Sequence, residues 1–98
     1  KNNDLLLNEI APRVHNSGHL TINAFNVSQF EGHVRAVCDL EIIDPEKISN
    51  SAEMINILGK EIEEYRLKTF SKHEFFFDYR KKEIKEKRKM GHLTILKK

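Results

Sequence analysis

Apolar and polar positions alternate in short runs, which predict several small elements rather than one long helix. One run repeats at spacings of four, seven and eight residues, as expected for one face of a helix over about residues 29–39. Its members are Phe30, Val34, Val37 and Cys38. Ser28 and Glu31 form a capping-box pattern at the helix start. We expect the apolar face to pack in the core, with His33 and Arg35 off that face.

Other runs predict strands, with one short helix among them. The predicted strands are residues 5–10, 54–58, 75–79 and 93–96. Gly59 ends the second strand, and the third would place Phe75, Phe77 and Tyr79 on one face. We expect a short helix over residues 60–68 and a hairpin connection over residues 82–87. Together these elements predict an α+β fold.

The size of 98 residues suits one small domain with a modest core. With 39% hydrophobic and 33% charged residues, a soluble globular class is favoured over disorder. There is no apolar run of the about 20 residues that span a bilayer, and the start lacks the basic and hydrophobic pattern of a signal peptide. The single cysteine, Cys38, fits a reducing compartment, so we expect a cytoplasmic protein without membrane contact.

The charges are unevenly distributed although the net charge is only +2. Residues 1–79 carry 8 Lys or Arg and 13 Asp or Glu, whereas residues 80–98 carry 9 and 2. Such asymmetry is typical of an anion-binding segment. A nucleic acid and a phosphorylated small molecule are both candidate anions.

The segment after the first predicted strand gathers chemically active side chains. Its polar groups are Asn8, Glu9, Arg13, His15, Asn16 and His19. Pro12, Ser17 and Gly18 interrupt regular structure, so we expect a constrained loop at the end of a buried strand. A carboxylate suits Mg²⁺ shared with phosphates, and arginine can bind a planar carboxylate with two hydrogen bonds.

Five segments, in order, resemble the carboxyl-terminal part of the N5-carboxyaminoimidazole ribonucleotide synthase family of ATP-grasp enzymes. They are residues 8–19, 28–36, 54–59, 79–81 and 88–92. The resemblance implies that the chain is a carboxyl-terminal fragment, because the family's enzymes are several times longer. It divides the chain into the end of an ATP-grasp core, residues 1–44, and a small β-rich domain, residues 45–98. In the family that domain resembles the closing domain of biotin carboxylase.

The resemblance also implies a reaction and a site. ATP and bicarbonate would give carboxyphosphate, and the amine of aminoimidazole ribonucleotide would then take the carboxyl group, in purine biosynthesis. By likeness to the family, Glu9 would bind Mg²⁺, with Asn8 supporting the ATP site. The implied catalytic and substrate-binding residues are Arg13, His15 and Asn16, and the implied ribonucleotide-binding cations are Lys81 and Arg88. The parent enzyme would be a homodimer, and we expect this fragment to be inactive alone.

One departure from the pattern and two alternatives remain at this point. Arg80 stands where the family has glycine, next to Lys81, which changes the surroundings of that lysine. Formate-dependent glycinamide ribonucleotide transformylase, another ATP-grasp enzyme, has a similar loop, although its pattern differs from His15–His19. A basic nucleic-acid-binding module built on the tail and on the aromatic residues 75–79 is an alternative of another class.

Overall fold

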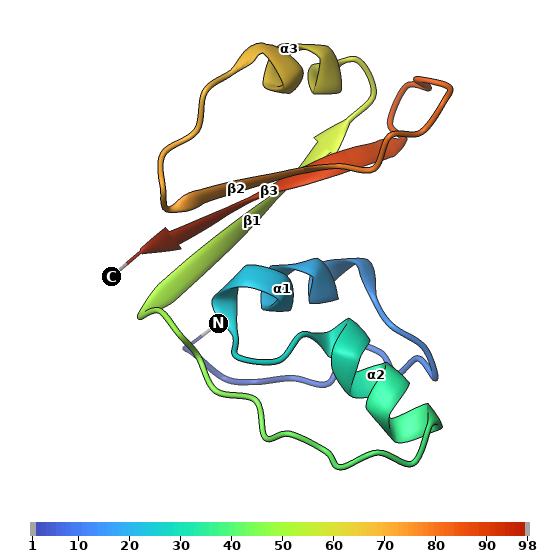
Figure 1. Cartoon of the computed structure of the whole chain (residues 1–98), viewed down its shortest axis with the longest axis vertical. Helices are drawn as coiled ribbons and strands as arrows, with labels where there is room; N and C mark the ends of the chain where they lie inside the picture. Colours follow the sequence, from blue (N-terminus) through green and yellow to red (C-terminus); the bar gives the residue numbers. More distant parts are fainter. Residues whose placement is uncertain (1, 98) are drawn as a thin grey trace.

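The computed structural model describes residues 2–97, which form a three-stranded antiparallel sheet with helices on both faces. In chain order the elements are η1 (Asn16–Leu20), α1 (Thr21–Ala24), α2 (Gln29–Val37), β1 (Ser51–Leu58), α3 (Glu61–Leu67), β2 (Glu74–Asp78) and β3 (Lys89–Lys97). Figure 1 shows α3 above the sheet, with α1 and α2 below it. The α+β fold class is therefore confirmed. None of the helices described is long and apolar enough to cross a membrane.

The strand order is β1-β3-β2, so the last strand lies in the centre and pairs antiparallel with both neighbours. The three strands predicted after residue 50 are confirmed, and β1 and β3 are longer than their patterns indicated. The predicted hairpin connects β2 to β3, and the predicted short helix is α3. A row across the sheet places Asn56 and Phe77 on either side of His92.

The hydrophobic core lies between α3 and one face of the sheet. Its buried members are Ile57, Ile62, Met90 and Leu93, with partly buried aromatic and aliphatic side chains packed around them. Alternation along each strand explains this arrangement, because Ile55 and Phe76 flank Leu93 on the same face. The opposite face of the sheet carries His92 and Thr94, and η1 and α1 cover it.

Local sequence determines both ends of α2. The Ser28 hydroxyl accepts the backbone N–H of Glu31 at 3.0 Å, as the capping-box pattern predicted. The helix ends at Val37, earlier than predicted, because Asp39 adopts a left-handed conformation with φ of 55°. The Leu40 N–H then donates to the Arg35 carbonyl at 2.8 Å, which is the Schellman arrangement of a helix end.

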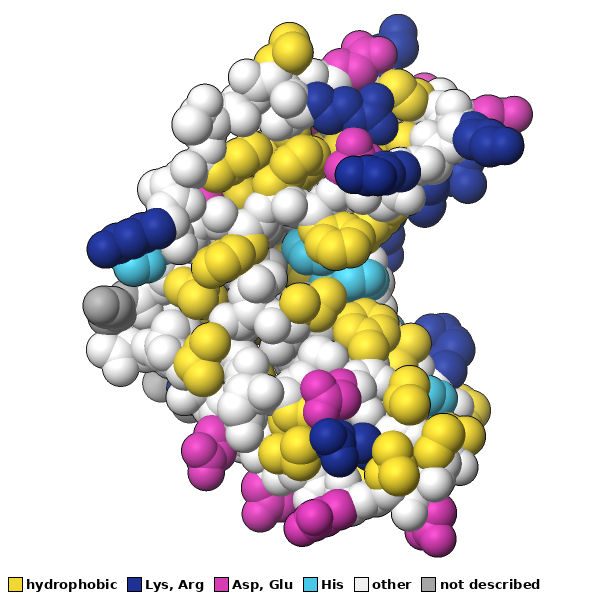
Figure 2. Space-filling model, viewed as in Figure 1, with side chains coloured by type: hydrophobic (Ala, Val, Ile, Leu, Met, Phe, Trp, Pro, Cys, Tyr) yellow, Lys and Arg dark blue, Asp and Glu magenta, His cyan; other side chains and the backbone are white. Residues whose placement is uncertain are grey.

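The prediction that the apolar face of α2 packs in the core is wrong. Val34 is 55% exposed and Val37 is 72% exposed, and no residue of α2 is buried. Figure 2 shows hydrophobic side chains on the surface of the lower half, which contains α2. Helical spacing shows which side chains share a face, but the cover of that face depends on elements elsewhere in the chain.

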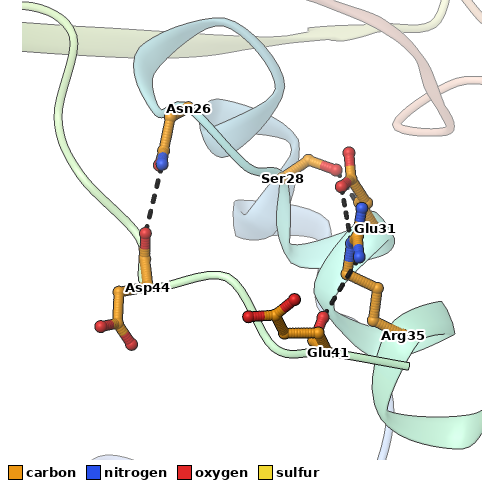
Figure 3. Close-up of polar contacts among 6 residues, drawn as sticks. All are labelled: Asn26, Ser28, Glu31, Arg35, Glu41 and Asp44. Carbon is orange, nitrogen blue, oxygen red and sulfur yellow. Dashed lines mark hydrogen bonds and ion pairs between the residues drawn. The ribbon is translucent and has the colours of Figure 1, made fainter. Parts of the chain in front are cut away.

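The long connection after α2 runs along the helical half and is held by polar contacts (Figure 3). The Asn26 side-chain amide donates to the Asp44 carbonyl at 3.2 Å, and the Asn26 side-chain oxygen accepts the Glu46 N–H at 2.7 Å. The Arg35 guanidinium donates to the Glu41 carbonyl at 3.1 Å and pairs with Glu31 at 2.8 Å. Side-chain contacts to the backbone, together with backbone hydrogen bonds between residues 24–26 and 46–48, therefore fix this connection.

The predicted buried strand at residues 5–10 is also wrong. This segment has no regular secondary structure and no strand partner within residues 2–97, and Leu5 is 99% exposed while Ile10 is 83% exposed. A strand needs a neighbour for its backbone hydrogen bonds and its apolar side chains. Residues 2–97 supply neither to this segment, so the apolar pattern alone does not form the element.

Candidate functional site

The loop before η1 forms an open pocket of about 350 Å³. Its lining includes four of the six polar residues that the sequence singled out there, Asn8, Glu9, Arg13 and His15, together with Ala11, Ser17 and Gln29. The His15 Nε2 atom lies 2.8 Å from a Glu9 carboxylate oxygen. Both side chains reach solvent, so a ligand in the pocket can contact either of them.

A set of hydrogen bonds below the pocket fixes the loop. The His15 N–H donates to the Gln29 side-chain oxygen at 2.8 Å, and the Gln29 N–H donates to the Thr21 hydroxyl at 2.7 Å. The Thr21 hydroxyl donates to the Gly18 carbonyl, and the Gly18 N–H donates to the His15 carbonyl at 2.9 Å. A side chain at position 18 would collide with Gln29, which explains the need for glycine.

Asn16 and His19 connect the loop to the sheet. The Asn16 amide donates to the Asn56 side-chain oxygen in β1 at 2.8 Å. The His19 Nδ1 atom lies 2.6 Å from the Asn16 carbonyl, and the His19 ring contacts the His92 ring at a centroid separation of 5.0 Å. The loop and the sheet are therefore joined directly through Asn16, a predicted site residue. Figure 2 shows histidine and hydrophobic side chains next to one another in the middle of the visible surface.

Arg13 lines the pocket from its rim. Its guanidinium donates to the Val14 carbonyl at 3.2 Å, which is its only hydrogen bond within the part of the chain that the structure describes. Arginine has five N–H donors, so several remain available for a carboxylate or a phosphate. The structure therefore brings Asn8, Glu9, Arg13 and His15 to one pocket, whereas Asn16 is committed to the sheet through its amide.

Lys81 and Arg88 lie in the connection between β2 and β3. The Lys81 ammonium donates to the Lys89 carbonyl at 2.6 Å and lies 5.6 Å from the centre of the Tyr79 ring. The Arg88 guanidinium donates to the Glu83 carbonyl at 3.2 Å. Lys81 thus contacts backbone at the base of the connection, and Arg88 contacts backbone within it. A shared contact of both cations to one phosphate stays a prediction.

Arg80 adopts a left-handed conformation with φ of 56°, which glycine accepts at less cost. The Asp78 carboxylate accepts the Arg80 N–H at 2.8 Å and also pairs with the Arg66 guanidinium at 2.7 Å. The Arg66 hydrogen bond holds the pKa of Asp78 below its usual value, and the Arg80 N–H acts in the same direction. A charged carboxylate therefore stabilises the turn that presents Lys81.

Burial strongly perturbs the titration of the residues next to this turn. His92 is 1% exposed, and desolvation, with the neighbouring His19, lowers the pKa of His92 to about 4. Burial raises the pKa of Tyr79, so its hydroxyl stays protonated at neutral pH. The Tyr79 hydroxyl and His92 Nδ1 are hydrogen-bonded at 2.9 Å.

Four residues of the site carry no clear signal in the sequence: Gln29, Asn56, Tyr79 and His92. In the sequence, Gln29 is only the first residue of the predicted helix, and its bond to the His15 backbone is a long-range contact. Tyr79 and His92 were within matched segments, but their contact depends on strand register. Among residues 2–97, no three His, Cys, Asp or Glu side chains are grouped to hold a metal ion. Glu9 could supply one carboxylate ligand to a metal that is also bound by phosphates.

Comparison with known proteins gives the same answer for both parts of the chain. Residues 1–30 match the ATP-grasp domain, and residues 52–98 match the phosphoribosylaminoimidazole carboxylase C-terminal domain. N5-carboxyaminoimidazole ribonucleotide synthase of Escherichia coli is 45% identical over 91 residues, which are 93% of this chain and 24% of that protein. The Bacillus subtilis enzyme of the same name is 44% identical, over 96% of this chain and 25% of that protein.

Solved structures agree. N5-carboxyaminoimidazole synthetase from Staphylococcus aureus superimposes with a TM-score of 0.82 at 41% identity, over 98% of this chain and 26% of that one. The Aspergillus clavatus enzyme, in complex with ADP and 5-aminoimidazole ribonucleotide, gives 0.79 at 32% identity, over 99% of this chain and 28% of that one. The chain spans about a quarter of the length of these relatives.

The loop, the adjoining helix and the antiparallel sheet define the end of an ATP-grasp region followed by a small carboxyl-terminal domain. Within that class, the chain belongs to the N5-carboxyaminoimidazole ribonucleotide synthase family and corresponds to its carboxyl-terminal region. The resemblance found from five sequence segments is confirmed.

Proposed function

We propose that this chain supplies part of the active site of an enzyme that uses ATP to carboxylate aminoimidazole ribonucleotide with bicarbonate. The observation that carries the proposal is the pocket in which Glu9, Arg13 and His15 line one open space. A carboxylate, an arginine and an imidazole together suit a reaction between a metal-bound nucleotide and small oxyanions. The relatives' names and the ligands of the A. clavatus enzyme support the same assignment.

The residues would divide the work by their chemistry. Arg13 would hold bicarbonate, and then carboxyphosphate, through parallel N–H donors, and so neutralise charge that develops on the oxygens. His15, oriented by its backbone bond to Gln29, would donate to the same oxygens from across the pocket. The remaining Asn16 amide hydrogen and side-chain oxygen would orient the ribonucleotide amine. Catalysis would then depend on positioning and charge neutralisation.

Two further assignments concern the nucleotide and the ribonucleotide phosphate. Glu9 would bind Mg²⁺, which neutralises phosphate charge when bound, and Asn8 would support the adjoining ATP phosphates. Lys81 and Arg88 would bind the phosphate of the ribonucleotide from the β2–β3 connection. The segregation of 9 basic residues into residues 80–98 supports a phosphate-binding role there.

We also propose that the boundary between the two domains lies near residue 44. The two family matches leave residues 31–51 for it, and the connection over residues 38–50 contains no helix or strand. The homodimer, the cytoplasmic location and the inactivity of the chain alone stay predictions.

The test is an ADP-release assay on a protein of the relatives' length that carries this chain. We expect ADP formation to require both bicarbonate and aminoimidazole ribonucleotide. Arg13→Ala should lower kcat/KM by about 100-fold or more, the effect of losing one charge-stabilising donor group. Arg35→Ala is the matched control, because the Arg35 side chain bonds to Glu31 on α2 and to the Glu41 carbonyl in the following connection and does not line the pocket. Equal activity of the two variants would contradict the proposal.

A further inference from the structure

A cluster of ring side chains lies between the loop of the candidate site and the β2–β3 connection, and neither the reaction nor the core accounts for it. We call it the ring cluster, and its members are His19, Phe30, Phe77, Tyr79 and His92. They come from η1, from α2, from the edge strand β2 and the residue after it, and from the central strand β3. The ring cluster therefore connects the two parts of the chain that carry the proposed site residues.

The centre of the ring cluster is the pair formed by the half-buried Tyr79 and the buried His92. The Tyr79 hydroxyl lies 2.9 Å from His92 Nδ1, and the two ring centres are 5.7 Å apart. The Phe77 ring stacks on the His92 ring at 5.6 Å with an interplanar angle of 1°. Because its ring is enclosed on several sides, His92 has little freedom to reorient, and Tyr79 is held through its hydroxyl.

One end of the ring cluster contacts the loop. The His19 ring lies 5.0 Å from the His92 ring and 5.3 Å from the Tyr79 ring. Its Nδ1 atom lies 2.6 Å from the Asn16 carbonyl, and a carbonyl oxygen can only accept, so this nitrogen must carry a hydrogen. A movement of Tyr79 or His92 would therefore shift the His19 ring, and with it the Asn16 carbonyl to which His19 is hydrogen-bonded.

The other end contacts the connection that carries the cations. Tyr79 directly follows β2, and its N–H donates to the Met90 carbonyl at 3.0 Å, which closes the hairpin. The Lys81 ammonium lies 5.6 Å from the centre of the Tyr79 ring, within the range of a cation–π contact. The placement of the Tyr79 ring thus influences the direction of the Lys81 side chain.

We propose that Tyr79 and His92 are positioning residues, whose hydroxyl–imidazole hydrogen bond fixes the loop at Asn16 against the turn that presents Lys81. The proposal rests on the proposed function, because it assigns both ends of the ring cluster to one site. Tyr79 acts as the donor and the neutral His92 imidazole as the acceptor, with its hydrogen on Nε2. The lowered pKa of His92, about 4, agrees with a neutral imidazole at physiological pH.

The test compares Tyr79→Phe with Tyr65→Phe. Tyr65 packs against Phe70 and Phe76 on the other face of the sheet, so its variant removes a hydroxyl without touching the ring cluster. In a protein of the relatives' length, Tyr79→Phe should raise KM for aminoimidazole ribonucleotide about tenfold, the effect of one buried hydrogen bond. KM for ATP should change less than about twofold, and Tyr65→Phe should change neither KM.

A spectroscopic measurement on the 98-residue chain separates this proposal from the function. With ¹⁵N-labelled histidine, we expect the His92 Nδ1 resonance to have the shift of a hydrogen-bonded acceptor and to move in Tyr79→Phe only. Amide resonances over residues 16–19 should move with it. If the enzyme shows no ribonucleotide-dependent activity but these shifts occur, the proposed function fails and the positioning contact stands. If Tyr79→Phe, like Tyr65→Phe, changes neither these resonances nor KM for the ribonucleotide, or changes only one of the two, the positioning role is wrong.

Discussion

The buried imidazole of His92 predicts that the protein loses stability in mild acid. In the native state its pKa is about 4, because burial and the neighbouring His19 disfavour the charged form. In the unfolded chain the pKa would be the ordinary value of about 6.5. Between these values the unfolded state binds a proton that the native state excludes. The contribution of neutral His92 to the free energy of unfolding is therefore fully present above about pH 6.5 and is lost as the pH falls toward 4.

The magnitude follows from the difference of about 2.5 pH units between the two pKa values. At about 1.4 kcal/mol per unit, protonation of His92 in the unfolded chain lowers the free energy of unfolding by about 3 kcal/mol when the pH reaches 4. The Tyr79 hydroxyl, which contacts the ring, does not titrate in this range because its pKa is raised above 10.0. The loss is a large fraction of the stability of a domain of this size.

Urea unfolding followed by circular dichroism, at several pH values between about 7.5 and 4.5, measures this loss. His92→Gln cannot titrate, so its free energy of unfolding should vary less with pH than that of the unsubstituted chain, by most of that 3 kcal/mol. His33→Gln is the matched control, because His33 is exposed on α2 and its replacement should leave the pH dependence unchanged. An unchanged pH dependence in His92→Gln would show that burial of His92 is not the cause of the loss in acid.

Three other substitutions test local features of the fold by the same unfolding assay. Arg80→Gly should stabilise the chain by about 1 kcal/mol, because φ is 56° there, whereas Lys82→Gly in the same connection should not stabilise it. Thr94→Val should be neutral or stabilising by about 1 kcal/mol, because the buried Thr94 hydroxyl has no hydrogen-bond partner among the described residues. Thr69→Val, at an exposed position, is the control. Ser28→Ala should destabilise α2 by about 1 kcal/mol, and an unchanged midpoint would contradict the capping role.

Short-range patterns predicted much of this fold. The cap at Ser28, the glycine after β1 and the aromatic run of β2 are local signals, and each element formed where its signal stood. The hairpin followed because two apolar runs flank a short charged connection. These features depend on interactions within a few residues, which a single sequence contains.

Features that depend on distant partners could not be predicted. The leucines at residues 5–7 and the valines Val34 and Val37 of α2 have the right spacing, but they remain exposed within residues 2–97. The site shows the same limit. Gln29 binds the His15 backbone only because Gly18 leaves room, and Tyr79 meets His92 only because of strand register.

The central claim is that this chain contributes a ribonucleotide-binding site to an ATP-dependent enzyme. Its most direct test is the steady-state kinetics of Lys81→Ala in a protein of the relatives' length, with ADP release as the readout. KM for aminoimidazole ribonucleotide should rise at least about tenfold, as expected for the loss of a charge-assisted contact, while KM for ATP should be nearly unchanged. An unchanged KM for the ribonucleotide, or the absence of ribonucleotide-dependent ADP release from the unsubstituted protein, would contradict the claim.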